Sequence, residues 1–76
     1  MFYVYLIRSC VKNWTYIGST TNLRNRFKEH NQGKVKSTEP YLPFALIYYE
    51  AYMNLSLARK RENELKKKGA AKRNVI

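Results

Sequence analysis

Five side chains in this 76-residue sequence could together do hydrolytic chemistry on a phosphate ester. They are two tyrosines near the N-terminus, an arginine, a histidine and a glutamate: Tyr5, Tyr16, Arg26, His30 and Glu62. Hydrolysis of a phosphodiester needs a water made nucleophilic, a positive counter-charge on the phosphate and stabilisation of the leaving oxygen. Acid–base groups, a guanidinium and a carboxylate can meet those three needs.

Arg26 and Glu62 carry the charged part of this chemistry. A guanidinium meets phosphate oxygens through a planar fork, which gives both charge and orientation. Glu62 can hold one hard divalent cation, because Mg²⁺ takes few protein carboxylates and fills its octahedron with water and phosphate oxygens. The chain has five acidic residues, all Glu. A site with two metal ions is therefore not expected, and Glu62 is the predicted ligand of one Mg²⁺ or Mn²⁺ ion.

Each of these residues also has a purely structural interpretation. Tyr5 and Tyr16 could be aromatic residues that fill a sheet, and His30 could be a hydrogen-bond donor at a helix end. Glu62 could pair with Lys66 one helical turn later. Residue type alone leaves these alternatives open, and it is their combination that favours a catalytic site.

The first half of the chain predicts a hairpin followed by a helix. Residues 2–8 are almost all aliphatic or aromatic, which suits a central strand, and a polar break separates them from a second strand over 14–18. Thr21 or Asn22 can cap a helix that stops before Gly33. Arg26 and His30 then lie close to the apolar stripe of that helix.

The second half predicts a loop, a third strand and a second helix. Residues 34–43 lack a regular period, residues 44–50 suit a strand, and the helix runs from a cap at Asn54 or Ser56 to about residue 68. Its expected inner face holds Leu57, Ala58 and Leu65, with Glu62 at the edge. Residues 70–76 resemble the start of a short C-terminal helix. The predicted fold is α+β: one domain, 1–76, with a three-stranded antiparallel sheet flanked by helices in the order β-β-α-β-α.

Charge predicts the partner. Fifteen Lys and Arg against five acidic residues leave a net charge of +10, which favours a polyanion, and nucleic acid above a membrane surface. Contacts to this substrate are expected from a glycine that allows close approach and from basic residues of the loop and second helix: Gly18, Lys34, Lys36, Arg59, Lys60, Arg61 and Lys66. A lone Cys10 rules out an internal disulfide. No signal peptide or membrane span is visible, so a cytoplasmic location is expected.

Two tyrosine triplets give the sequence a family resemblance. Tyr3-Val4-Tyr5 is followed by Tyr16-Ile17-Gly18, with Arg26 eight and His30 twelve residues after Gly18, and with Glu62 in a later helix. This pattern resembles the GIY-YIG nuclease family, in its small stand-alone branch. It is similar to the nuclease domain of the bacterial excision-repair nuclease subunit and to that of the GIY-YIG homing endonucleases.

The resemblance implies a metal-dependent endonuclease that cuts DNA, and structure-specific cutting in repair or recombination is one form that this activity could take. It also gives the motif tyrosines the role of general base or proton relay, and Tyr16, with Tyr5 beside it, is the preferred residue. An ordinary tyrosine has a pKa near 10, so the base could be Tyr16, Tyr5 or His30. The chain departs from the pattern at Tyr3, where the first triplet has glycine, and at Ser19, where excision-repair relatives have lysine.

Other functions stay open at this stage. The domain could be a non-catalytic nucleic-acid-binding module that retains a nuclease fold, or a scaffold that docks on an acidic partner. DNA is preferred over RNA as the partner, although basic and aromatic residues serve both. The sequence shows no DNA-recognition extension, so a protein partner could supply targeting.

Overall fold

A computed structural model describes residues 1–67 of the chain. The elements are β1 (Phe2–Ser9), β2 (Thr15–Thr20), α1 (Leu23–Asn31), a short 3₁₀ helix η1 (Glu39–Tyr41), β3 (Phe44–Tyr52) and α2 (Leu55–Lys67). The predicted α+β class and the order β-β-α-β-α are confirmed, and η1 is an addition within the expected loop. The predicted C-terminal helix over 70–76 lies outside the described residues. Within residues 1–67, neither helix is long and apolar enough to cross a bilayer.

The sheet is antiparallel with the strand order β2-β1-β3. The hydrophobic strand β1 therefore lies in the centre, as its composition predicts, and β2 forms one edge. Tyr5 pairs with Gly18 on β2 and with Tyr49 on β3. Ile47 has no partner in β1 and forms a bulge in β3.

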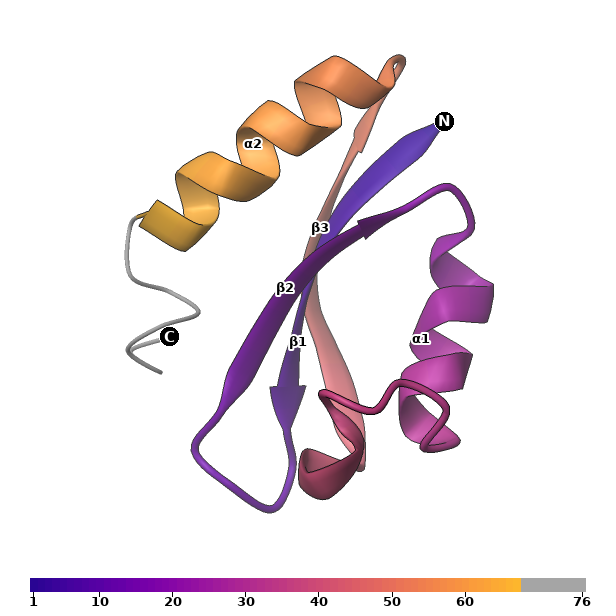
Figure 1. Cartoon of the computed structure of the whole chain (residues 1–76), viewed down its shortest axis with the longest axis vertical. Coiled ribbons are helices and arrows are strands. Elements are labelled where there is room, and N and C mark those ends of the chain that lie inside the picture. The colour runs from indigo at the N-terminus through magenta and orange to yellow at the C-terminus, as the bar shows by residue number, and fades with distance from the viewer. Residues whose placement is uncertain (68–76) are drawn as a thin grey trace.

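The two helices cover opposite faces of the sheet (Figure 1). Successive residues of a strand point to opposite faces, so each face has its own core. On the α1 face, Tyr5, Ile7 and Phe44 pack with partly buried residues of α1 that include Leu23 and Phe27. On the α2 face, the buried core consists of Val4, Leu6, Ile17 and Ala58.

Helix termini follow the predicted caps. The side chain of Asn22 accepts a hydrogen bond from the Asn25 backbone amide, and that of Asn54 accepts one from the Leu57 amide. Gly33, with φ of 76°, follows the end of α1 in the left-handed conformation that favours glycine.

The predicted inner face of α2 is wrong at one position. Leu57 is 48% exposed, whereas Ala58 is fully buried and Leu65 packs against the same core. The reason is rotational: Ala58 and Leu65 lie almost in line on a helix, and Leu57 lies about 100° from Ala58. Arg61 and Glu62 occupy the borders of the buried face instead.

Glu50 fixes α2 to β3. Its carboxylate accepts hydrogen bonds from Arg61 Nε at 2.9 Å and from the hydroxyls of Tyr48 and Tyr52. Burial would raise the pKa of Glu50, but Arg61 and the two tyrosines outweigh it and hold that pKa at about 2. Arg61 therefore has a structural partner, one residue before Glu62.

Acid unfolding should depend on Glu50. Its pKa is about 2 in the folded chain against an ordinary 4.5, so the unfolded state binds more protons between these values. The resulting stability is complete above about pH 4.5 and is lost as the pH falls towards 2. We expect Glu50→Gln to flatten the pH dependence of the unfolding free energy in that window, as measured by urea denaturation. Glu39→Gln, at an exposed position, should keep the wild-type slope, and equal slopes for all three proteins would contradict this account.

Candidate active site

A buried chain of hydrogen bonds joins three elements on the α1 face. The Tyr5 hydroxyl lies 2.8 Å from His30 Nε2, and His30 Nδ1 lies 2.8 Å from Thr38 Oγ1. Tyr5 is 1% exposed, and His30 and Thr38 are fully buried. His30 thus lies inside the core rather than at its border. Its Nε2 atom faces the Tyr5 hydroxyl.

Thr38 bears on the direction of these hydrogen bonds. Its hydroxyl can donate to the Val35 carbonyl at 3.2 Å, and in that arrangement its oxygen accepts the hydrogen bond from His30 Nδ1. His30 therefore carries its proton on Nδ1, and its Nε2 lone pair accepts the Tyr5 proton. The network assigns one tautomer and one donor at each step.

Burial sets the ionisation of Tyr5 and His30. Desolvation, with Tyr16 as a lesser cause, raises the pKa of Tyr5 to about 12, although Arg26 opposes the shift. Desolvation and the positive charge of Arg26 lower the pKa of His30 below 6.5. At pH 7 the pair is a protonated phenol beside a neutral imidazole, which is the arrangement in which the imidazole can accept the phenol proton.

Tyr16 lies beside this pair. Its ring centroid is 6.3 Å from that of Tyr5 and 5.3 Å from that of His30, and its other neighbour is the stacked ring of Trp14. Tyr16 is half-buried, whereas Tyr5 is buried. The two predicted tyrosines are therefore in contact, and Tyr16 is the more accessible of them.

Gly18 makes room for the tyrosines. A Cβ atom at this position would lie 2.7 Å from the Tyr5 hydroxyl and 2.9 Å from the Tyr16 ring. The Tyr5 side chain thus crosses the edge strand directly over Gly18. A close approach to Gly18 was predicted, and in the structure the side chains of Tyr5 and Tyr16 make that approach.

Arg26 lies on the same face of the sheet. Its Nη1 atom contacts Glu29 Oε1 at 3.0 Å, and that hydrogen bond is the main cause that raises the pKa of Arg26. Its side chain is 39% exposed. Interaction with the Tyr5 hydroxyl also raises the pKa of Arg26. The anion that the helix position predicts is supplied within the molecule by Glu29, and the remaining guanidinium nitrogens can meet a second anion.

Glu62 approaches from the opposite face. Its Oε1 accepts a hydrogen bond from the Ser19 hydroxyl at 2.8 Å, and its Oε2 contacts Lys66 Nζ at 2.9 Å. Ser19 and Gly18 are consecutive, so their side-chain positions face α2 and α1 respectively. The charge of Glu62 nevertheless contributes to the raised pKa of Tyr5. The edge strand β2 therefore lies between the two tyrosines on the α1 face and Glu62 on the α2 face.

Glu62 is the carboxylate that could hold a hard cation. It lines a pocket of about 250 Å³ with Ser19, Arg59 and Asn63, and one of its oxygens already attracts the ammonium group of Lys66. Within residues 1–67, no cluster of three or more His, Cys, Asp or Glu side chains could hold a metal ion. A cation at Glu62 would therefore keep most of its coordination for water and phosphate, as Mg²⁺ does.

The predicted basic contacts divide into two groups. Arg59 lines the Glu62 pocket, and Lys34, Lys36 and Lys60 are exposed. Arg61 and Lys66 instead hold Glu50 and Glu62 through ion pairs.

Sequence reasoning missed Thr38 and the role of Ser19. Thr38 lies in an irregular loop eight residues after His30, where no periodicity indicates a contact. Ser19 follows the second triplet directly, and its outward position on a strand was the available signal. Asn63 lies beside Glu62 in the same pocket.

The sequence is similar to a known catalytic-domain family and to proteins of several organisms. The model of the GIY-YIG catalytic domain matches residues 1–74. A UPF0213 protein of Staphylococcus haemolyticus is 42% identical over 65 residues, which are 84% of this chain and 78% of that protein. A UPF0213 protein of Natronomonas pharaonis is 38% identical over 72 residues, covering 93% and 84% respectively. No solved structure matches the chain.

Replacing Gly18 should displace Tyr5. We expect Gly18→Ala to lower the unfolding free energy by about 1–3 kcal/mol, because overpacking forces buried side chains to move. Urea denaturation would measure the loss. The double variant Gly18→Ala/Tyr5→Phe removes one clashing oxygen and should lose less than the two single variants combined. Wild-type stability of Gly18→Ala would show that Tyr5 does not cross the strand here.

His30 is the one histidine of the chain, so its ring signals can be assigned directly. We expect NMR at pH 7 to show a neutral ring protonated on Nδ1, with a titration midpoint below 6.5. Thr38→Val removes the acceptor and should lower the population of that tautomer. A midpoint above 6.5, or a proton on Nε2, would contradict the hydrogen-bond directions.

Proposed function

The chain belongs to the GIY-YIG family, and we propose that it is a metal-dependent endonuclease that hydrolyses phosphodiester bonds in DNA. One observation carries the proposal: a phenol hydrogen-bonded to a buried neutral imidazole lies near Arg26, and the Glu62 carboxylate is held at Ser19, the residue after Gly18. In this arrangement the imidazole nitrogen Nε2 is directed at the phenol and can take up its proton.

Tyr5 and His30 are proposed to activate the attacking water. The water proton passes to the Tyr5 oxygen as the Tyr5 proton passes to His30 Nε2, so charge builds on the imidazole and the hydroxide attacks phosphorus. Thr38 holds the imidazole orientation through Nδ1. Attack breaks the bond between phosphorus and the leaving oxygen, which takes a proton from solvent water. The imidazolium, whose pKa is lowered, releases its proton through Tyr5 to solvent. Tyr16, which is more accessible, orients the water.

Arg26 is proposed to bind the phosphate. Its fork meets two oxygens and stabilises the extra negative charge that develops at phosphorus. Glu29 holds the guanidinium from behind. A single Mg²⁺ or Mn²⁺ ion held by Glu62 would supply Lewis-acid stabilisation of charge on the phosphate and leaving oxygens.

The net charge of +10 supports DNA as the substrate and backbone contacts as the main source of affinity. The exposed basic residues Lys34, Lys36, Arg59 and Lys60 are the proposed contacts. Such contacts carry no sequence information, so we propose recognition of DNA structure, in repair or recombination, with targeting by a protein partner.

A non-catalytic nucleic-acid-binding module is the second candidate. One observation favours it: Glu62 is paired with Lys66 and Arg26 with Glu29, so both charges are satisfied without a substrate. Such a module would bind DNA in a salt-dependent way without a metal requirement.

A cleavage assay separates the two functions. Purified protein is incubated with single-stranded, nicked, branched and fully paired DNA, with Mg²⁺ or Mn²⁺ or with EDTA. We expect metal-dependent cleavage that falls by at least about 100-fold in Arg26→Lys and Glu62→Gln, since each removes transition-state stabilisation. Glu64→Gln, on the same helix with a 47% exposed side chain, should cut like wild type. Absence of cleavage from every DNA, or full activity in both variants, would refute the endonuclease.

The same assay identifies the base. Tyr5→Phe should lose about 100-fold or more and Tyr16→Phe less, with circular dichroism confirming that both variants fold. A larger loss in Tyr16→Phe would assign the proton transfer to Tyr16 and leave Tyr5 a structural role.

A further inference from the structure

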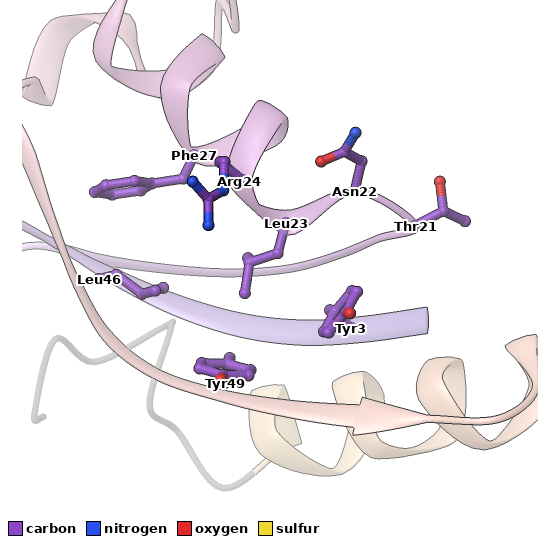
Figure 2. Close-up of a pocket in the computed structure, with 8 residues that line it drawn as sticks. All are labelled: Tyr3, Thr21, Asn22, Leu23, Arg24, Phe27, Leu46 and Tyr49. Atoms are coloured by element: carbon purple, nitrogen blue, oxygen red, sulfur yellow. The ribbon is translucent and has the colours of Figure 1, made fainter. Parts of the chain in front are cut away.

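An open groove of about 470 Å³ lies between α1 and the sheet (Figure 2). In Figure 2, Leu23, Arg24 and Phe27 extend from α1, and Tyr3, Leu46 and Tyr49 line the sheet side. The turn over 21–22 closes one end. The catalytic roles proposed above use none of these residues.

The walls of the groove are aromatic and apolar, yet open to solvent. Tyr49 is 53% exposed and Leu46 is 37% exposed. The rings of Tyr3 and Tyr49 meet edge to face, with centroids 6.2 Å apart. Exposed aromatic surface beside a concave pocket is typical of a binding site, here one for a flat, partly apolar group.

Arg24 adds a positive charge at the rim. It is exposed, and within residues 1–67 it makes no ion pair. Arg24 and Arg26 lie about 160° apart around α1, so they flank its buried face on opposite sides. The groove lining contains no acidic residue. Its ligand should therefore combine a flat apolar part with an anionic part, as a nucleotide does.

The groove and the site share the α1 face of the sheet and lie on opposite sides of α1. Tyr49 is the cross-strand partner of Tyr5 on the face that α1 covers. The turn over 21–22 leads directly from the end of β2, where Gly18 and Ser19 lie, to the groove. A strand of DNA whose phosphate lies at Arg26 could thus bend around the start of α1 and reach Tyr49.

We propose that this groove binds an unpaired nucleobase of the DNA strand that is cut. The base stacks on Tyr49 and meets Tyr3 at its edge, and Arg24 contacts its phosphate. The volume suits one or two nucleotides and excludes a duplex, in which neighbouring base pairs also cover both faces of each base. The substrate class is then DNA with a single-stranded segment next to the cleaved bond. This inference rests on the proposed function.

Binding measured without cleavage tests the groove. Fluorescence anisotropy in EDTA compares a single strand, a duplex with a single-stranded flap and a fully paired duplex of the same sequence. We expect Tyr49→Leu to weaken binding of the first two about tenfold, since loss of one stacked base corresponds to about that factor. Binding of the paired duplex should stay within about twofold. Tyr49→Phe, which keeps the ring, should bind all three like wild type.

Two matched variants control for general effects. Tyr48→Leu is the same change at the neighbouring position of β3, which faces α2, and it should leave binding of the flap substrate within about twofold. Arg24→Gln should weaken binding of the flap substrate more than Lys28→Gln, which removes one exposed charge elsewhere on α1. Unfolding curves confirm that each variant folds.

Three results would overturn the inference. They are an equal loss on the paired duplex, an equal loss in Tyr48→Leu, and wild-type binding in Tyr49→Leu. A dimer in sedimentation that Tyr49→Leu dissociates would also do so, because a second copy would then cover the groove. Selective binding of unpaired DNA without any cleavage would refute the proposed endonuclease but keep the groove. Cleavage that Tyr49→Leu leaves unchanged would refute the groove but keep the proposed endonuclease.

Discussion

The hydrogen bond from Tyr5 to His30 is the interaction on which the candidate site depends. It requires a phenol to cross an edge strand, and this is possible only because Gly18 offers no side chain at the crossing point. It also requires His30 to be buried and to accept the Tyr5 proton at Nε2, an arrangement in which Nδ1 donates to Thr38. Burial then keeps the phenol protonated and the imidazole neutral. The chemistry of the pair is therefore a consequence of packing.

The position of β2 at the edge of the sheet explains how so small a domain assembles a site. Side chains of a strand inside a sheet are separated by the sheet itself. At an edge, groups from the two faces can approach each other around the strand. Here these groups are Arg26, which lies on α1, and Glu62, which lies on α2. Each helix is anchored separately, α1 by its packing on Tyr5 and Ile7 and α2 through Glu50 and Arg61. The groove beside Tyr49 uses the other side of the α1 face.

Much of this could be predicted from the sequence because local signals are strong. The hydrophobic run of β1, the caps at Asn22 and Asn54 and the stop at Gly33 each act over a few residues, and the structure confirms them. The error at Leu57 arose because a helix of mostly charged residues gives a weak apolar stripe, and the turn that points at the sheet is set by tertiary contacts. Thr38 was beyond prediction, since a loop between two elements carries no period. The separation of Glu62 from the tyrosines by a strand also depends on the packing of α2, which charge alone does not specify.

The central claim is that Glu62 and Arg26, held on opposite faces, act on one phosphate at the edge of β2. Diffraction from crystals of the Tyr5→Phe variant with a short DNA and Mn²⁺, recorded at the manganese edge, tests this claim directly. The account predicts one anomalous peak beside Glu62 and a DNA phosphate that contacts both the manganese and the Arg26 guanidinium. Manganese bound away from Glu62, or a phosphate at Arg26 out of reach of that ion, would contradict it.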